Sequence, residues 1–304
     1  FDTPKNIQDA AISAIRRGYT RYTPASGIIE LKRSVCRKLK TDNGLDYAPS
    51  QIIISNGAKH CIHNALMALL NPGDEVIIAQ QRDALLGAVT DRTKAIILNS
   101  PNNPTGSVYT EDELEMIADI AVERDIAVIS DEIYEKLTYG GKRHISIASL
   151  GEQIKKRTVV INGMSKAYAM TGWRIGYAAA EESIIKVMSN LQSHATSNPN
   201  SIAQYASVEA LDGDQSQVES MRAEFERRRD YMVGRVNSIP DLSCVKPDGA
   251  FYVMVNISKL KGRTIAGKTI AGSMDFCGML LEKARVAAIP GIAFGDDDYI
   301  RLSY

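Results

Sequence analysis

The sequence lacks the features that mark secreted, membrane-spanning and nucleic-acid-binding proteins. Its four cysteines are far apart and form no CxxC pair, which is typical of reduced thiols in a cytosolic protein and not of a disulfide framework or zinc site. No apolar run approaches the length that spans a bilayer, and no signal peptide is visible. Basic and acidic residues both number 36, whereas nucleic-acid-binding proteins usually have a basic excess. We therefore expect a cytoplasmic protein without membrane or nucleic-acid partners.

The histidines and the basic residues indicate no metal or polyanion site by themselves. His60 and His63 are neighbours on a predicted helix, but no third ligand is near them in the sequence. Two basic runs, at residues 155–157 and 227–229, lie beside acidic residues or within a helical pattern. Each run can be a solvated helix face or a phosphate-binding patch, and the solvated helix face is the simpler interpretation.

What the sequence does have is a regular alternation of strand and helix patterns. A length of 304 residues with 44% hydrophobic residues is typical of a globular chain of about two domains. Short apolar runs at residues 52–54, 76–78, 95–98, 126–129 and 159–161 are apolar on both faces, as in parallel sheets covered by helices. Between them, residues 62, 65, 66, 69 and 70 form a helical stripe, and Thr110 with Glu113 forms a capping box.

These patterns predict an α/β fold with two domains. Residues 27–230 are expected to form the large domain, a mostly parallel sheet flanked by helices. Residues 231–304, together with residues 1–26, are expected to form a smaller α+β domain. Its signals are a charged helix around residues 221–235, turns at Pro240 and Pro247, a helix near residues 273–283 and two short strands.

In open α/β sheets, ligands bind beyond the carboxyl ends of the strands. The first strand is followed by Ser55-Asn56-Gly57-Ala58-Lys59, which begins a predicted helix. Small residues at a helix start expose backbone N–H groups, and the helix dipole adds positive potential, so this turn suits a phosphate. A plain helix cap with a tight turn is the alternative.

The later strands are followed by polar and charged residues. Asp131 emerges from a buried strand, where a carboxylate needs a cation or a strong donor, although a helix cap would look similar. The run NSPNNPTG, at residues 99–106, offers the amide of Asn103, although a surface turn would also fit. The last strand is followed by Lys166 and then Arg174.

One ligand uses this whole inventory, namely pyridoxal 5′-phosphate (PLP). A lysine forms a Schiff base with its aldehyde, and a carboxylate keeps its ring nitrogen protonated so that the ring accepts electrons. An arginine and a helix start hold its phosphate. Any single match is weak, but the order and setting of the residues make the combination specific.

The sequence resembles the class I aminotransferases of PLP fold type I, and is closest to the bacterial aspartate aminotransferase branch. The resemblance covers the chain from end to end, with the motifs in the order of that family. They are YTRYTPASG, SNGAKH, NSPNNPTG, SDEIYEKL, NGMSKAYAMTGWRIGY, SNPNSIAQ, GAFYVM and YIRLSY.

The resemblance implies a role for each matching residue. Lys166 would be the Schiff-base lysine and the general base, and Asp131 would pair with the ring nitrogen. Tyr134 and Asn103 would hydrogen-bond the 3-oxygen of the ring, and Asn103 would also lie by the substrate. The phosphate would be held by residues from two motifs, namely Arg174, Gly57, Ala58, Lys59 and Ser165.

The resemblance also implies the partners. Arg301 matches the arginine that binds the α-carboxylate of the substrate in a bidentate fork. Tyr22 matches the tyrosine that reaches the phosphate in the neighbouring subunit, which implies a homodimer. The substrates would be an L-amino acid, with aspartate the best single donor, and a 2-oxo acid such as 2-oxoglutarate.

Three segments usual in that family have no counterpart in the sequence. They are a helix and glycine-rich turn before Phe1, a strand with loops between Gln81 and Arg82, and a closing helix after Tyr304. The second would carry the aromatic ring that stacks on the cofactor. We expect a longer natural chain, which an intact mass above 33.2 kDa would support. Otherwise the protein lacks its stacking ring and would bind PLP poorly. Residues 79–94 could serve as one helical crossover between strands.

Two other functions fit the same residues. Another aminotransferase specificity, aromatic or alanine, or a PLP-dependent β-lyase would share the motifs GWRIGY and IRLSY. A non-catalytic PLP-domain scaffold or ligand sensor is a different class, but it usually needs an attached DNA-binding module, and none is visible. The presence of Lys166, Asp131 and Arg301 also argues against that function.

Overall fold

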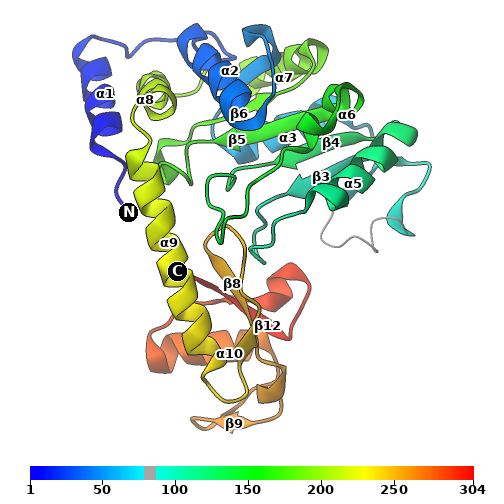
Figure 1. Ribbon diagram of the computed structural model, residues 1–304, viewed down its shortest axis with the longest axis vertical. Helices are drawn as coiled ribbons and strands as arrows, with labels where there is room; N and C mark the ends of the chain where they lie inside the picture. The colour runs from blue at the N-terminus through cyan, green and yellow to red at the C-terminus, as the bar shows by residue number, and fades with distance from the viewer. Residues whose placement is uncertain (79–86) are drawn as a thin grey trace. The chain divides into compact units, whose positions relative to one another are not determined.

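The computed structural model describes residues 1–78 and 87–304, which divide into two compact units (Figure 1). The first unit contains the large sheet, and the second contains a smaller sheet with its own core. No helix within these residues is long and apolar enough to cross a bilayer. The first unit comprises Phe1–Ser100, Tyr109–Tyr134 and His144–Glu219; the second comprises Pro101–Val108, Glu135–Arg143 and Ser220–Tyr304.

The sheet of the first unit has six described strands in the order β1-β6-β5-β4-β3-β2. Strands β2 to β5 are parallel, whereas β6 pairs antiparallel with both β5 and β1. Four of the five apolar runs that predicted strands lie wholly in strands, and the run at residues 126–129 begins one residue before β4. The strand β6 was not predicted, because its sequence GYAA has no branched apolar residue. The bounds are β1 (Ile52–Ser55), β2 (Glu75–Ile78), β3 (Thr93–Asn99), β4 (Ala127–Asp131), β5 (Thr158–Gly163) and β6 (Gly176–Ala179).

Helices cover both faces of this sheet. Because side chains alternate along a strand, Ile52 and Ile54 pack in a cluster with α2 and α8, whereas Ile53 packs with α3 and α7. Val128 packs with α5 and α6. The helices are α1 (Lys5–Arg16), α2 (Ile29–Asn43), α3 (Ala58–Leu69), α5 (Glu111–Glu123), α6 (Glu152–Arg157), α7 (Glu182–Ala195) and α8 (Ser201–Asp212), with the 3₁₀ turns η1 (Pro49–Gln51), η2 (Ile147–Leu150) and η3 (Thr171–Trp173).

The capping box predicted at α5 is confirmed. The Thr110 hydroxyl accepts a hydrogen bond from the Glu113 backbone N–H, and the Glu113 carboxylate accepts one from the Thr110 backbone N–H. Both orphan donors at this helix start are therefore satisfied by side chains.

The second unit is an antiparallel sheet in the order β11-β12-β8-β7, packed against helices. Val253, Val255 and Ile300 of the sheet pack with Phe276 of α10. The elements are most of α9 (Ser216–Asn237), β7 (Ser243–Cys244), β8 (Tyr252–Asn256), η4 (Ser258–Leu260), the hairpin β9 (Thr264–Ile265) and β10 (Lys268–Thr269), α10 (Ser273–Met279), the π-helical turn η5 (Leu280–Ala284), β11 (Ile289–Pro290), η6 (Gly291–Phe294) and β12 (Tyr299–Ser303).

The structure assigns two segments differently from the sequence analysis. Residues 1–26, which were expected in the smaller domain, belong to the first unit because α1 packs against α8. The smaller unit also begins earlier than residue 231, since Ser220 already belongs to it. The expected crossover at residues 79–94, and the junction of Gln81 and Arg82, fall on residues 79–86, which lie outside the described residues.

The basic run at residues 227–229 is only partly a solvated helix face. Arg227 and Arg228 pair with Glu224 on the exposed side of α9. Arg229 is buried instead, with its guanidinium 4.7 Å from the ring centre of Tyr139 and donating to the Pro247 carbonyl. The simpler interpretation was therefore wrong for Arg229, because the pattern of charges does not show which side of a long helix meets an aromatic ring.

Candidate active site

The polar residues of the first unit gather at one edge of its sheet. Asp131 ends β4, and Lys166 follows β5, the parallel neighbour of β4. Arg174 precedes β6, and β6 begins at Gly176, which pairs with both Gly163 at the end of β5 and Ser55 at the end of β1. This register brings the carboxyl ends of β1, β4 and β5 to the same edge, as expected for a ligand site in an open α/β sheet.

Asp131 has the most perturbed carboxyl group at this edge. Burial raises its pKa to about 6, although the Ile133 backbone N–H donates to it over 3.2 Å. The negative charge of Glu132 raises the pKa further, and the positive charge of Lys166 lowers it. A carboxylate in such a place is stabilised by a cationic N–H donor.

Lys166 and Tyr134 lie together beside Asp131. The Lys166 Nζ is 5.6 Å from the ring centre of Tyr134, which is itself buried. Asp131 ends β4 and Lys166 follows β5, its parallel neighbour, so the two side chains come from adjacent strand ends. An amine, a phenol and a carboxyl group from two adjacent strand ends can bind and move protons in one small space.

A cradle for an anion forms where α3 begins. Gly57 has a φ of 90°, in the left-handed region that favours glycine. The Arg174 guanidinium lies against it and donates to the Asn56 and Thr171 carbonyls over 3.2 and 3.0 Å. A Cβ atom at Gly57 would overlap this guanidinium. The arginine and the helix start therefore meet at one point, with the N–H groups of α3 adding positive potential.

The remaining residues predicted for the phosphate differ in exposure. Ala58 begins α3, packed closely against Gly176 of β6, and Lys59 follows on the exposed side. Ser165 is buried just before Lys166, whereas Tyr22 has 91% of its surface exposed. The structure thus places Ala58, Lys59 and Ser165 on the elements that carry Gly57 and Lys166.

Asn103 and Arg301 meet in the second unit. Arg301 Nη1 donates to Asn103 Oδ1 over 2.7 Å, and the guanidinium lies 4.4 Å from the ring centre of Tyr252 and 5.2 Å from that of Phe294. The Arg301 Nε is buried and makes no hydrogen bond to any described residue. A buried donor without a partner is costly, so this arginine suits an anionic ligand that would accept from it.

These observations fit PLP. The cradle at Gly57 and Arg174 suits a phosphate, and the buried Asp131 suits a protonated ring nitrogen. Lys166 supplies an amine near both Asp131 and Tyr134.

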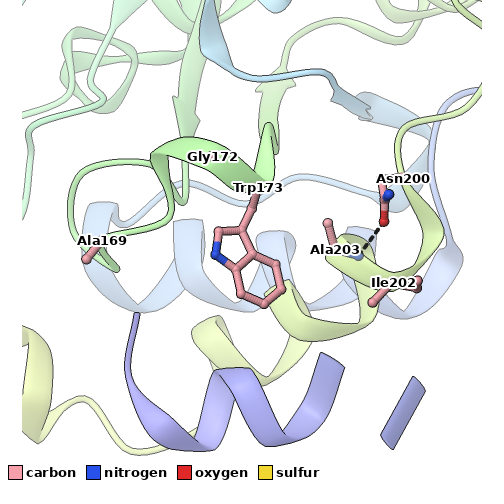
Figure 2. A pocket seen from close by; sticks show the side chains of 6 residues that line it. All are labelled: Ala169, Gly172, Trp173, Asn200, Ile202 and Ala203. Atoms are coloured by element: carbon pink, nitrogen blue, oxygen red, sulfur yellow. Dashed lines mark hydrogen bonds between the residues drawn. The ribbon is translucent and has the colours of Figure 1, made fainter. Parts of the chain in front are cut away.

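A pocket of about 400 Å³ around Trp173 is distinct from the site of Lys166 and Asp131 (Figure 2). Its lining residues carry no charge, so it does not suit a phosphate or a carboxylate; they are Ala169, Gly172, Trp173, Asn200, Ile202 and Ala203.

The sequence matches the family described as "Aminotransferase class I and II" over residues 1–82 and 79–304. The chain belongs to this family. It is similar to an aspartate aminotransferase of Bacillus subtilis (strain 168), with 44% identity over 334 positions that cover the whole chain and 84% of the relative. Family members of this kind use PLP, so the chain is a PLP-dependent aminotransferase.

Solved structures support the same fold. An aspartate aminotransferase from Rhizobium meliloti has a TM-score of 0.96 and 40% identity, covering all of this chain and 84% of that one. An aromatic aminotransferase from Pyrococcus horikoshii OT3 has a TM-score of 0.93 and 39% identity, covering all of this chain and 88% of that one. The fold is therefore PLP fold type I, as the sequence predicted.

Two buried residues of this aminotransferase next to the site were not singled out from the sequence. Glu132 is buried beside Asp131, and its carboxylate lies 3.0 Å from His144 Nε2. Glu132 could have been noticed, since strand alternation places it on the same face as the apolar Val128. His144 follows in a loop without a periodic pattern, so only the fold brings it to Glu132.

Proposed function

We propose that this aminotransferase moves an amino group from an L-amino acid, with aspartate the best candidate, to a 2-oxo acid such as 2-oxoglutarate. Support comes from the relatives, several of which are named aspartate aminotransferase or aspartate/prephenate aminotransferase. The single structural observation that carries the proposal is the grouping of Lys166, Asp131 and Tyr134 at one sheet edge.

The chain's own residues account for the proton transfers. When bound, PLP supplies a ring that accepts the electron pair left on the substrate carbon as its proton departs. We propose that Asp131, as a carboxylate, accepts a hydrogen bond from the protonated ring nitrogen. Lys166 Nζ, as a neutral amine, would take the proton from the substrate Cα and hold it for the return transfer. Tyr134 would donate its phenol proton to the ring 3-oxygen, together with Asn103.

The substrate is proposed to be oriented through its carboxylate. The planar guanidinium of Arg301 offers parallel N–H donors that match the two carboxylate oxygens. Its Nε is the buried donor without a hydrogen bond among the described residues. The rings of Tyr252 and Phe294 hold the guanidinium plane, and Asn103 fixes one end of it. A substrate held in this way has its carboxylate fixed in one plane.

The assembly proposed is a homodimer that works in the cytoplasm. Tyr22 has 91% of its surface exposed, as expected for a side chain that reaches the phosphate of a partner subunit. The widely spaced cysteines suit a reducing compartment.

The decisive experiment is a panel of amino donors with 2-oxoglutarate as acceptor, following glutamate formation. Aspartate is expected to give the largest kcat/KM, and Lys166→Ala is expected to lower kcat by about 10²- to 10⁴-fold, the usual contribution of a general base. A purified protein that shows no visible absorption band of bound PLP, even after PLP is added, would refute the proposal.

An aromatic donor is the second candidate, because one similar structure is an aromatic aminotransferase. The same panel separates the two, since a preference for tyrosine or phenylalanine over aspartate would favour it. A β-lyase would instead release pyruvate and ammonia from cystathionine without any acceptor acid.

A further inference from the structure

A buried polar cluster lies at the end of β4, on the face opposite to Asp131. Glu132 is fully buried, and its Oε1 accepts hydrogen bonds from Ser130 Oγ over 2.9 Å and from Ser146 Oγ over 2.6 Å. Its Oε2 lies 3.0 Å from Nε2 of His144, whose side chain is also buried. The two serines are buried as well. We call Ser130, Glu132, His144 and Ser146 the Glu132 cluster.

The Glu132 cluster and Asp131 lie on opposite faces of β4. Side chains two apart on a strand share a face, and the bond from Ser130 to Glu132 shows this directly. Asp131, between them, therefore points the other way. The cluster occupies the face of Val128, on which the hydrophobic core with α5 and α6 packs.

Burying the carboxylate of Glu132 costs free energy, which favours a specific role for the cluster. A buried carboxylate loses its hydration and must recover it from donors. Ser146 stands at the position before η2 where a hydroxyl usually caps the turn, yet it makes no cap bond and donates to Glu132 instead. Two serine hydroxyls, one on β4 and one in a distant loop, thus donate to one carboxylate, and His144 Nε2 lies 3.0 Å from its other oxygen.

The backbone around Asp131 is held from both sides. The Glu132 N–H donates to the Ile161 carbonyl over 2.8 Å, and the Asp131 carbonyl accepts from Asn99 Nδ2 over 3.1 Å. With the Glu132 side chain anchored as well, the end of β4 has little freedom to turn Asp131 away from Lys166.

We propose that Glu132, held by His144 and the two serines, is a positioning residue that aims Asp131 at the ring nitrogen of PLP and adds negative charge behind it. This inference rests on the role proposed above for Asp131.

The charge of Glu132 shifts the pKa of Asp131 in the direction that the proposal requires. Burial is the main cause of the raised pKa of Asp131, and the charge of Glu132 adds to it. The titratable groups near Glu132 include His144, the carboxylate of Glu135, which lies within 4.8 Å of both, and the buried Tyr47, whose phenol pKa is raised first by burial and then by Glu132. A more basic Asp131 holds the proton of the ring nitrogen more strongly.

The test compares the purified holoenzymes of wild type, Glu132→Gln and the control Glu152→Gln. Glu152 is a suitable control because the same chemical change is made on a side chain that is 77% exposed. Two readouts are used, namely the dissociation constant of PLP and the pH midpoint of the visible absorption of the bound cofactor. Neither depends on turnover.

Glu132→Gln is expected to weaken PLP binding by about three- to tenfold and to lower the pH midpoint by about 0.5 to 1 unit, because removing a nearby negative charge disfavours the protonated, positively charged form of the nitrogen at Lys166. Glu152→Gln is expected to match wild type. A purely structural role for Glu132 would lower the melting temperature without moving the midpoint, and that result would overturn the proposal.

Ser146→Ala keeps the proposal testable if Glu132→Gln does not fold. It removes one donor to Glu132 and leaves the charge, so PLP binding is expected to weaken by about two- to threefold with little change in the midpoint. Unchanged PLP binding in Ser146→Ala would count against the inference. A wild-type protein that holds no PLP would overturn the proposed function itself, and this inference with it.

Discussion

At the scale of single residues, the burial of Asp131 destabilises the folded protein when its carboxyl group is charged. Its folded-state pKa of about 6 exceeds the ordinary 3.8 because burial disfavours the charged form. Below pH 3.8 the carboxyl is neutral in both folded and unfolded protein. As pH rises towards 6 the unfolded chain ionises more readily, so the cofactor-free protein loses stability over that window. A bound cation at Asp131 would reverse this loss.

Asp131→Asn is therefore expected to have opposite effects on stability and on binding. At pH 7.5 the cofactor-free variant should be more stable than wild type by about 1 to 3 kcal/mol, since about two pKa units of penalty are removed. PLP binding should weaken, because a neutral amide cannot neutralise a protonated ring nitrogen. Urea unfolding at pH 3.5 and 7.5, with a PLP titration, measures both. Equal stabilities at both pH values would contradict the explanation.

The role proposed for Arg301 predicts a substitution effect that separates the geometry of its N–H donors from its charge. Arg301→Lys keeps the charge but loses the paired N–H donors, so kcat/KM for the amino donor should fall by about 10- to 100-fold, the worth of a charge-assisted hydrogen bond. Steady-state kinetics with varied donor measures this. Arg263→Lys is the matched control, since Arg263 forms an exposed ion pair with Asp241. Similar losses in both variants would contradict a specific role for Arg301.

At the scale of elements, the sequence was most informative where burial on both faces leaves a continuous apolar run. Strands β1 to β5 were predicted for this reason, whereas the small residues of β6 carry no such signal. The residues that follow those strands could be proposed as a site, because parallel strands end at one edge. The Glu132 cluster could not be proposed from the sequence. His144 lies in a loop with no periodic pattern, and only the folded structure shows that this loop comes back to Glu132.

The capping box of α5 gives a prediction for an element away from the site. Thr110→Ala should lower the free energy of unfolding by about 1 kcal/mol, because the Glu113 backbone N–H loses its acceptor. Chemical denaturation measures the change, and Thr110→Ser should restore most of it. Activity at 25 °C should stay unchanged, so a large loss of kcat would show that α5 affects the site.

At the scale of the whole molecule, the proposed homodimer makes each active site depend on two chains. If Tyr22 serves the partner's phosphate, a Lys166→Ala chain still donates a functional Tyr22. A Tyr22→Ala chain still provides Lys166. One site of the mixed dimer then contains both wild-type residues, whereas Tyr22 acting within its own chain would leave no such site.

Mixing the two variants under conditions of subunit exchange should therefore restore activity above that of either alone, at limiting PLP. The expected recovery approaches half of the wild-type activity per mixed dimer. Kinetics on the mixture, with size determined by sedimentation, measures this. A mixture no more active than the sum of its parts, or a protein that sediments as a monomer, would contradict the proposed assembly.

The single tryptophan gives this chain an internal reporter. Trp173 lies in the first unit, and its indole N–H donates to Thr3 Oγ1 over 3.0 Å. Ultraviolet emission excited at the indole therefore follows the melting of that unit alone, while calorimetry records the heat absorbed by both. Two transitions that fail to coincide would show that the halves of this enzyme come apart independently.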